Sequence, residues 1–162
     1  IHHELKNQFQ KSDLFIGVSK RTQFIQEANI AYKNAITALR MAYKDKRIVY
    51  FDSLGVVGAL INDTNINDVR EMAYSFLGNI HLNGPKDLDL IRTLYSFLLN
   101  GGNLEKTADD LSLSISGLRY RIHKLEDILQ KDLRSPLVSY QLLMSIQALI
   151  ILGEIDINAK VI

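Results

Sequence analysis

The sequence contains no cysteine among its 162 residues. Disulfides, thiolate-bound metals and cysteine nucleophiles are therefore excluded, and a chain without thiols suits a reducing compartment, so we expect a cytoplasmic protein. Proline is also scarce, with only two residues, while 47% of the residues are hydrophobic and 8% are aromatic. This composition is typical of a globular chain of one or two small domains with ample core material.

A strong net charge is also lacking. Lysine and arginine number 19 against 18 aspartates and glutamates, which gives a formal net charge of +1 at pH 7. From Gly84 to Ile162 nine basic residues stand against ten acidic ones, so no basic domain indicates a nucleic-acid partner by charge alone. Attraction to a polyanion would have to come from a local cluster of basic side chains.

No apolar run has the length of a membrane-spanning helix. The longest, from Leu137 to Leu152, falls short of the roughly 20 residues that a bilayer requires, and serine and glutamine residues interrupt it. Ser135-Pro136 before it and Gly153 after it resemble the start and end of a globular helix at 136–152. Because its polar residues fall at scattered angles, apolar surface remains on more than one face. We predict no membrane partner and a homodimer in which a second subunit covers part of this surface.

Motifs for catalysis or metal binding are absent from the sequence. His2-His3-Glu4 lacks the i, i+4 spacing of a helical metal pair. Gly101-Gly102 is not followed by the Lys-Ser/Thr of a phosphate loop. His81 stands alone, and His123 has no Ser, Asp or Cys partner with motif-like placement. We therefore expect no enzymatic activity, no cofactor and no metal.

The first third of the chain predicts an α-β-α-β order. β-Branched and aromatic residues indicate strands at 13–18 and 47–51, and the segment from Thr22 to Tyr43 between them indicates a helix. A helix from His2 to Phe9 would complete the order. Leu54 to Ile61 predicts a short apolar helix, and residues 62–65 predict a turn.

Two amphipathic helices are predicted next. The first is a connecting helix whose apolar residues share one face: Ile66, Val69, Met72, Ala73, Phe76, Leu77 and Ile80. Asn83-Gly84-Pro85 separates it from the second, whose apolar residues are Leu88, Ile91, Leu94, Tyr95 and Leu98. Asn100-Gly101-Gly102 is expected to end the second helix.

The segment from Asn103 to Leu133 has the pattern of a helix-turn-helix. Apolar residues recur at helical spacing in its first half (Leu104, Ala108, Leu111) and in its second half (Leu118, Ile122, Leu125, Leu129). The connection from Ser112 to Ile115 has the length that lets the first helix brace the second in a DNA major groove.

The second of these helices, at about 116–129, carries the candidate DNA-binding residues. They are polar or basic side chains that can meet phosphates, sugars or base edges: Ser114, Ser116, Arg119, Tyr120, Arg121, His123 and Lys124. Arg119 and Arg121 flank the apolar stripe on opposite sides. Ser114 and Ser116 lie near the helix start, where hydroxyls and free backbone amides suit a phosphate as well as a cap.

Motifs in both halves of the chain carry a family resemblance. Those in the second half are Thr93-Leu94-Tyr95-Ser96-Phe97-Leu98, Asn100-Gly101-Gly102-Asn103, Thr107-Ala108, Leu111, Leu118-Arg119-Tyr120-Arg121, Leu125-Glu126 and Asp132-Leu133. In this order and spacing they resemble the C-terminal output domain of PucR/CdaR-type bacterial transcriptional regulators, which is itself similar to the Fis-type helix-turn-helix. Upstream, Leu14-Phe15-Ile16-Gly17-Val18, Ala31-Tyr32 and Val49-Tyr50-Phe51-Asp52 resemble the end of the GGDEF-like domain that precedes the output domain in this family.

The resemblance implies a mostly α fold in three parts. Residues 1–62 would be the α-β-α-β end of a GGDEF-like regulatory domain, residues 63–84 a connecting helix, and residues 85–162 a Fis-type helix-turn-helix DNA-binding domain. The implied function is a transcriptional regulator that binds double-stranded DNA as a dimer. Because the chain starts at Ile1, we expect a piece of a longer protein whose N-terminal regions sense a small-molecule effector. The signature hairpin of GGDEF cyclases would lie before residue 1, so nucleotide cyclisation is not expected.

The chain departs from this family at the start of the second helix. Where these regulators usually carry a His-Arg-Asn-Thr-like stretch, it has Ser114-Ile115-Ser116-Gly117, and neither Ile115 nor Gly117 offers a polar side chain. A second hypothesis therefore stays open, in which the helices form a protein-interaction or dimerisation module that has lost specific DNA contacts. The near-neutral charge of the C-terminal half is consistent with it.

Overall fold

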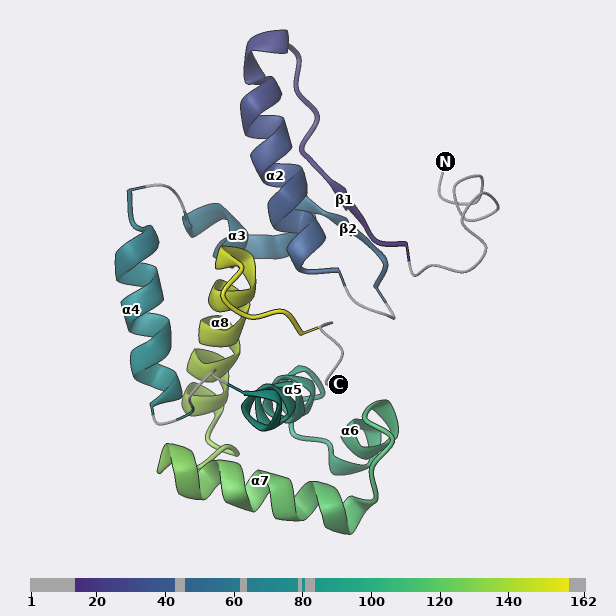
Figure 1. Ribbon diagram of the computed structural model, residues 1–162, viewed down its shortest axis with the longest axis vertical. Coiled ribbons are helices and arrows are strands. Elements are labelled where there is room, and N and C mark those ends of the chain that lie inside the picture. The colour runs from purple at the N-terminus through teal and green to yellow at the C-terminus, as the bar shows by residue number, and fades with distance from the viewer. Residues whose placement is uncertain (1–13, 43–45, 62–63, 79, 81–83, 158–162) are drawn as a thin grey trace. The chain divides into compact units, whose positions relative to one another are not determined.

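The computed structural model describes residues 14–42, 46–61, 64–78, 80 and 84–157 (Figure 1). Most of these residues are helical, and the strands among them form one two-stranded sheet, which confirms the predicted mostly α class. The chain divides after Leu60 into two compact units, Ile1–Leu60 and Ile61–Ile162. The helix predicted at residues 2–9 lies outside the described residues.

The first unit is built on a β-α-β arrangement. Strands β1 (Ile16–Val18) and β2 (Ile48–Tyr50) pair in parallel. Helix α2 (Ala28–Arg40), preceded by the 3₁₀ turn η1 (Ile25–Glu27), supplies the crossover that parallel strands require. Both strands and the helix are shorter than the sequence predicted. Strand propensity marks residues that favour an extended backbone, whereas a strand extends only as far as its partner offers hydrogen bonds.

Gly17 in β1 allows α2 to lie directly against the sheet. A Cβ atom at this position would collide with backbone atoms of Ala35 and Leu39 in α2. The core of the unit consists of the small or β-branched residues Ala38, Ala42 and Val49. Close approach of helix and strand therefore depends on small residues on both elements.

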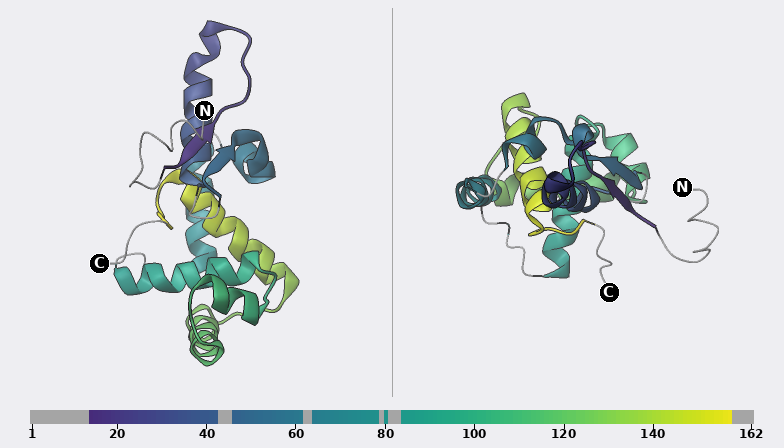
Figure 2. Two further views of the ribbon diagram at one scale, coloured as in Figure 1. Left: turned by 90° about the vertical axis from the view of Figure 1, so that its right-hand side faces the viewer. Right: turned by 90° about the horizontal axis from the view of Figure 1, so that it is seen from above.

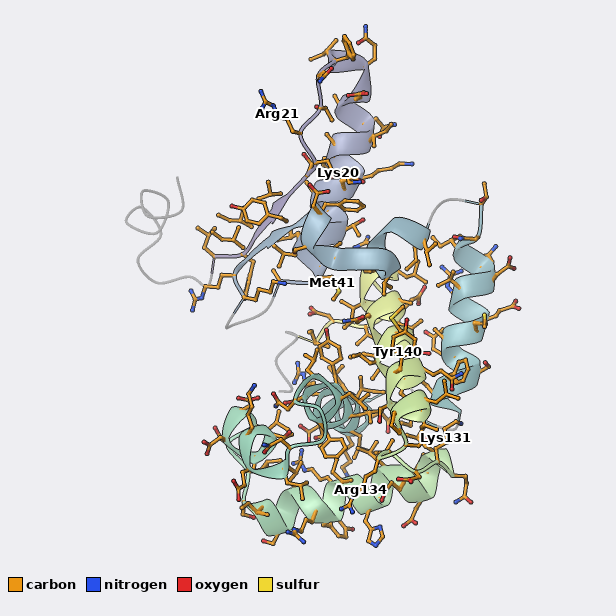
Figure 3. The ribbon with its side chains drawn as sticks, turned by 180° about the vertical axis from the view of Figure 1, so that it is seen from behind. Lys20, Arg21, Met41, Lys131, Arg134 and Tyr140 are labelled. Atoms are coloured by element: carbon orange, nitrogen blue, oxygen red, sulfur yellow. The ribbon has the colours of Figure 1, made fainter. Side chains whose placement is uncertain are left out.

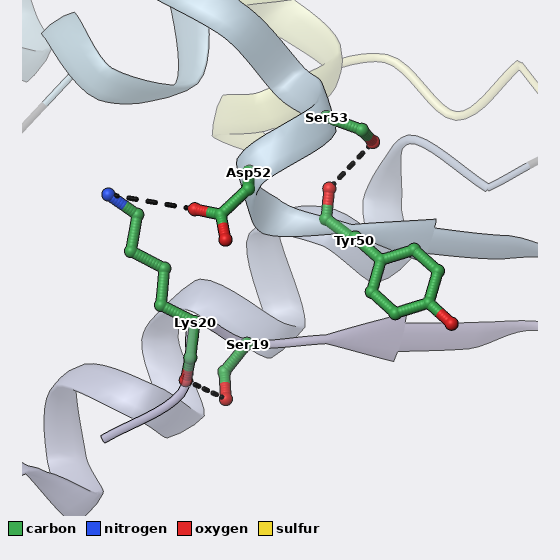
Figure 4. A network of polar contacts seen from close by, with 5 residues as sticks. All are labelled: Ser19, Lys20, Tyr50, Asp52 and Ser53. Atoms are coloured by element: carbon green, nitrogen blue, oxygen red, sulfur yellow. Dashed lines mark hydrogen bonds and ion pairs between the residues drawn. The ribbon is translucent and has the colours of Figure 1, made fainter. Parts of the chain in front are cut away.

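The segments that follow the two strands are joined by polar contacts at the surface (Figure 4). Lys20 Nζ lies 3.7 Å from Asp52 Oδ1. The hydroxyls of Ser19 and Ser53 donate to the backbone carbonyls of Lys20 and Tyr50 at 2.9 Å and 2.7 Å. Because the side chains of Lys20 and Asp52 are both exposed, solvent screening leaves their ion pair a contribution of about 0–1 kcal/mol.

A second 3₁₀ turn, η2 (Phe51–Leu54), and the short helix α3 (Gly55–Leu60) complete the first unit. The sequence predicted a helix from Leu54 to Ile61, and α3 lies within that range. Gly55 starts α3 with a φ of 63°, a left-handed conformation that glycine adopts without the strain a Cβ would cause.

The second unit is helical along nearly all of its described length. α4 (Ile66–Leu77) and α8 (Pro136–Leu152) lie side by side, and α5 (Pro85–Leu99) packs against α8 (Figure 1). α6 (Leu104–Asp110) contacts both α5 and α7 (Ile115–Leu129). Figure 1 shows α5 end-on and α7 lengthwise, and the left view of Figure 2 shows the reverse, so these two helices cross at a large angle.

Each of these helices except α6 contributes large, fully buried side chains to the core of the second unit. These are Leu77, Ile91, Thr93, Leu94, Leu118, Leu125, Leu133, Leu142, Ile146, Leu149 and Ile150. α6 contributes the smaller buried residues Thr107 and Ala108. The helix predicted around Leu88 to Leu98 is α5, and it ends at Leu99 as the following Asn-Gly-Gly sequence predicted.

The buried face of α4 is narrower than the sequence predicted. Ala73 and Leu77 are buried, and Ile80 is buried beyond the helix end. Met72, which the periodicity also placed on this face, is 64% exposed. The prediction for Met72 was wrong because adjacent residues are separated by about 100° around a helix, so Met72 and Ala73 cannot both face the core of a helix packed along one line.

α8 begins at Pro136 and ends at Leu152, as the sequence predicted. Gly153 follows it in a left-handed conformation with a φ of 78°. α4 and α5 cover much of the apolar surface that the sequence assigned in part to a second subunit, whereas Leu137 and Tyr140 near the helix start are exposed (Figure 3). No helix in the described part of the chain combines the length and apolarity needed to cross a membrane.

Glu154 connects α4 to the end of α8. Its Oε1 atom lies 2.9 Å from Arg70 Nε, and its carboxylate also shares a hydrogen bond with the side chain of Tyr74. Burial raises the pKa of the Tyr74 hydroxyl, and the negative charge of Glu154 raises it further, while Arg70 opposes the shift. These contacts join side chains that are distant in the sequence and hold α4 along α8.

Candidate nucleic-acid interface

Helices α6 and α7 are the two helices of the predicted helix-turn-helix. Between them Ser112 adopts a left-handed conformation with a φ of 53°. The amide of Leu113 donates to the carbonyl of Ala108 at 2.8 Å, which closes the turn. α7 begins at Ile115 and ends at Leu129, within one residue of the range that the sequence predicted.

A side chain caps each of the two helices. Asn103 Oδ1 accepts a hydrogen bond from the Lys106 amide at 2.9 Å, and Ser114 Oγ accepts one from the Gly117 amide at 3.1 Å. Ser114 Oγ also lies 3.2 Å from Ser116 Oγ. A Cβ atom at residue 117 would stand 3.1 Å from the Ser114 hydroxyl oxygen, so glycine leaves room for the cap. The Ser114 hydroxyl is therefore used within the protein, where the sequence had allowed either a cap or a phosphate contact.

The apolar stripe of α7 is buried as predicted. Leu118, Ile122, Leu125 and Leu129 are all in the core. On α6, Ala108 is buried and lets the two helices approach closely, while Leu104 on α6 and Leu111 directly after it are half-buried. α7 is thereby fixed along one side to α5 and α6.

The opposite side of α7 is exposed along most of its length. It carries Ser116, Arg119, Tyr120, His123 and Lys124, all of which belong to the predicted DNA-binding set. Tyr120 has 71% of its surface exposed. The Nδ1 atom of His123 lies 3.6 Å from Glu126 Oε2, a distance that allows a weak ion pair when the imidazole is protonated. The structure thus brings these five side chains onto one accessible face.

Arg121 also belongs to the predicted set but does not lie on this exposed face. Its charged group lies against α5. Its Nη1 atom is 2.6 Å from Asp89 Oδ2 and donates a hydrogen bond to Thr93 Oγ1 at 3.2 Å. Its side chain is 30% exposed. The sequence placed Arg119 and Arg121 on opposite sides of the apolar stripe. In the structure Arg119 is exposed, whereas Arg121 lies against α5.

The side-chain amide of Asn100, which directly follows α5, holds the acidic end of α6. Asn100 Nδ2 donates to Asp110 Oδ2 at 2.6 Å and lies 3.3 Å from Thr107 Oγ1. Thr107 is fully buried, and its hydroxyl donates to the carbonyl of Asn103 at 2.6 Å. Sequence reasoning assigned Asn100 only to a helix end and missed this role. The polar side chain directly before Gly101-Gly102 was the available signal.

Two further basic residues follow α7. Lys131 and Arg134 lie in the segment that leads to α8 (Figure 3), and Arg134 is exposed. This segment is shaped by Gln130, which has a left-handed φ of 53°, and by Glu126, whose Oε1 accepts a hydrogen bond from the Leu133 amide at 3.3 Å. Sequence reasoning did not place Arg134 among the candidate contacts because it lies outside the helix pattern.

Within the described residues, no group of three or more histidine, aspartate or glutamate side chains is arranged to hold a metal ion. The exposed surface of α7 offers hydrogen-bond donors, cations and an aromatic ring, and it also carries the exposed carboxylate of Asp127. This combination suits a ligand that presents phosphates and base edges.

Comparison with known proteins identifies the helical domain. The family model of the PucR C-terminal helix-turn-helix domain matches residues 90–148, which include most of α5, all of α6 and α7, and most of α8. No curated protein and no solved structure matches the chain significantly. Residues 90–148 therefore match the C-terminal helix-turn-helix domain of PucR-type regulators, and this match supports a DNA-binding regulator in general.

Proposed function

We propose that this regulator binds double-stranded DNA by inserting α7 into the major groove. The observation that carries the proposal is the division of α7 into a buried apolar side and an exposed side of polar and basic residues. An α-helix fits the width of the major groove, and the helix-turn-helix presents its second helix there while the first braces it. α6 and α5 supply that brace.

Each position on the exposed side of α7 offers a different contact. Arg119 and Lys124, on its two flanks, meet phosphates or the acceptor edge of guanine. Tyr120 and His123 hydrogen-bond or pack against sugars and base edges. Ser116 lies in the first turn of α7, where its hydroxyl and the free backbone amides suit a phosphate. Ser114 supports this end of the helix as its cap.

The distribution of charge supports binding although the domain is not basic overall. Basic residues lie on α7 and directly after it, at Arg119, Lys124, Lys131 and Arg134, and they outnumber the acidic residues of the same segment, Glu126, Asp127 and Asp132. The carboxylate of Asp110 is held by the side-chain amide of Asn100, the residue that follows α5. A local basic cluster is sufficient for phosphate contacts, because the attraction between exposed charges decays within about 10 Å at moderate salt.

Salt-dependent DNA binding tests this face. DNA selected from a random pool, or the promoter of the neighbouring operon, serves as the ligand, and fluorescence anisotropy measures affinity at several salt concentrations. We expect Arg119→Ala to weaken binding and to reduce the slope of log K against log salt by about 0.9, the value for one lost phosphate contact. Arg21→Ala, an exposed arginine of the first unit, is the control and should change neither quantity. Unchanged binding in Arg119→Ala would remove this face from the proposal.

We also propose that the protein acts as a homodimer. Leu137 and Tyr140 leave exposed apolar surface at the start of α8. Dimeric helix-turn-helix proteins bind half-sites about one helical turn of DNA apart, which increases both affinity and specificity. Light scattering at micromolar concentration should report the mass of two chains, and the mass of one chain would contradict the dimer.

The first unit fits the end of a GGDEF-like regulatory domain. Its β-α-β order and parallel strand pairing are consistent with residues 1–62 belonging to such a domain, with residues 63–84 connecting it to the output domain at 85–162. An effector sensed by regions N-terminal to this chain would then alter DNA binding in the cytoplasm.

A protein-interaction or dimerisation module is the second candidate function. Ile115 favours it, because this residue opens α7 with an apolar side chain that is 42% exposed and offers no hydrogen bond to a base edge. DNA selection distinguishes the two functions. A module of this kind would enrich no sequence above the random pool while its dimer persisted.

A further inference from the structure

Arg121 belongs to α7, but its charged group is bound by α5. Nη1 contacts Asp89 Oδ2 at 2.6 Å and Thr93 Oγ1 at 3.2 Å. Thr93 is fully buried, and its hydroxyl donates to the backbone carbonyl of Asp89 at 2.8 Å. We call these three side chains the Arg121 contact. It lies on the side of α7 that faces α5.

Apolar packing and directional polar contacts act together on the orientation of α7 on α5. Hydrophobic attraction itself has no direction, so close packing of the side chains resists a turn or slide of the helix and polar contacts add to that resistance. A charge-assisted hydrogen bond depends on distance and angle and weakens when its partners are displaced. Because α5 and α7 cross at a large angle (Figures 1 and 2), a directional contact between them resists both turning and sliding.

The surroundings of Arg121 also disfavour direct phosphate binding. Asp89 already neutralises the guanidinium, and its own side chain is 45% exposed, so it would repel a phosphate that approached the same group. Arg119, two residues earlier in α7, is exposed on the opposite flank. The two arginines therefore differ in what their charges face.

We infer that Arg121 is a positioning residue, which orients α7 on α5 and so directs the exposed side of α7 at DNA without binding a phosphate itself. This inference rests on the proposed function, since the orientation of α7 affects affinity only if α7 contacts DNA. It assigns to α5 a part in DNA recognition through the Arg121 contact, although Asp89 and Thr93 touch no DNA in this arrangement.

The variant Asp89→Asn separates positioning from phosphate binding by the sign of its effect. If Arg121 positions α7, loss of the carboxylate should weaken affinity for the selected DNA about fivefold, the equivalent of one partly exposed ion pair. The slope of log K against log salt should not change, because no phosphate contact is lost. If Arg121 were a phosphate ligand restrained by Asp89, the same variant would bind more tightly, with a slope steeper by about 0.9. Tighter or unchanged binding overturns the inference.

Asp87→Asn is the matched control. Asp87 lies on α5 two residues before Asp89, and within the described residues its carboxylate has no partner on α7. The control removes the same charge from the same helix but leaves the Arg121 contact intact. We therefore expect no loss of affinity for the selected DNA. A loss equal to that of Asp89→Asn would reflect α5 as a whole and would overturn the assignment to Arg121.

Urea unfolding without DNA tests the contact independently of the proposed function. In a double-mutant cycle, Asp89→Asn should destabilise the wild-type chain more than it destabilises Arg121→Gln, since the contact is already broken there. Thr93→Val keeps the buried volume and provides a milder variant if Arg121→Gln fails to fold. If the losses of stability are additive while DNA binding is intact, the inference about Arg121 is overturned and the proposed function is not. Coupling in a chain that selects no DNA would instead reject the proposed function, and the positioning role with it.

Discussion

At the scale of single residues, the start of α7 depends on two small side chains. Ser114 closes the first turn through the Gly117 amide, and the absence of a side chain at Gly117 leaves space for that hydroxyl. The sequence placed Ser114 and Ser116 near this helix start and indicated of Gly117 only that it offers no polar side chain. The structure adds a local reason for glycine, because a Cβ would press on the capping oxygen.

Replacing Ser114 with alanine should destabilise the helix-turn-helix by about 1 kcal/mol, the usual contribution of a side-chain N-cap. Urea unfolding of the variant measures this change. Ser135→Ala is the matched control, since Ser135 holds the N-cap position of α8 without a side-chain capping bond and should change stability by a few tenths of a kcal/mol at most. Equal losses in both variants would show that the Ser114 bond contributes nothing of its own.

Arg119 and Arg121 show where residue-level prediction ends. Helical periodicity gives the angle of each side chain relative to the apolar stripe, and it placed both arginines at its edges. Periodicity carries no information about an acidic side chain that lies on another helix. Asp89 lies on α5, so the ion pair with Arg121 depends on how α5 and α7 cross.

At the scale of elements, α8 was predictable and its environment was not. Its length, its proline start and its glycine end are local signals, and all three agree with the structure. The neighbour that covers it, α4, comes from a segment far upstream in the sequence. The sequence therefore showed how much apolar surface α8 has, but could not show that a helix of the same chain covers much of it.

The burial of Tyr74 and its contact with Glu154 should make the α4–α8 packing sensitive to high pH. The folded protein raises the pKa of Tyr74. Its contribution to stability is therefore fully present below about pH 10, the ordinary pKa of tyrosine, and is lost as the pH rises from there through the folded pKa. Over that range the unfolded chain releases the proton while the folded chain still holds it.

Urea midpoints measured between about pH 8 and pH 11 check this expectation. The midpoint of the wild-type chain should fall more steeply than that of Tyr74→Phe, which has no hydroxyl to titrate there. Tyr120→Phe removes an exposed hydroxyl from α7 without altering α4 and should follow the wild-type curve. Parallel curves for the wild type and Tyr74→Phe would contradict the role of Tyr74.

At the scale of the whole molecule, the two units have opposite charge. Residues 1–60 hold nine basic and five acidic residues, and residues 61–162 hold ten basic and thirteen acidic ones. The positive charge of the chain is thus concentrated outside the helix-turn-helix unit. The DNA binding that we propose for α7 would then depend on the local placement of its arginine and lysine residues and on the orientation of the helix, more than on long-range attraction.

Shortened chains should show that the output unit includes α4. Residues 61–162 produced alone should unfold in one cooperative urea transition and bind the selected DNA with the affinity of the full chain. Residues 84–162 lack α4 and the buried side chain of Leu77, and they uncover apolar surface of α8, so they should be less stable by at least about 3 kcal/mol. Equal stability of the two shortened chains would contradict a structural role for α4 in this unit.

The sequence by itself determined the helices of the output domain and the apolar faces on which they pack, because helix boundaries and faces follow from residues a few positions apart. The tertiary structure decided which polar side chains remain available to DNA. Arg121 is bound by Asp89 and Thr93, and Asp110 by Asn100, whereas the other side of α7 faces solvent. These outcomes depend on partners on a different helix, and only the packing of α5 against α6 and α7 brings them within hydrogen-bond distance.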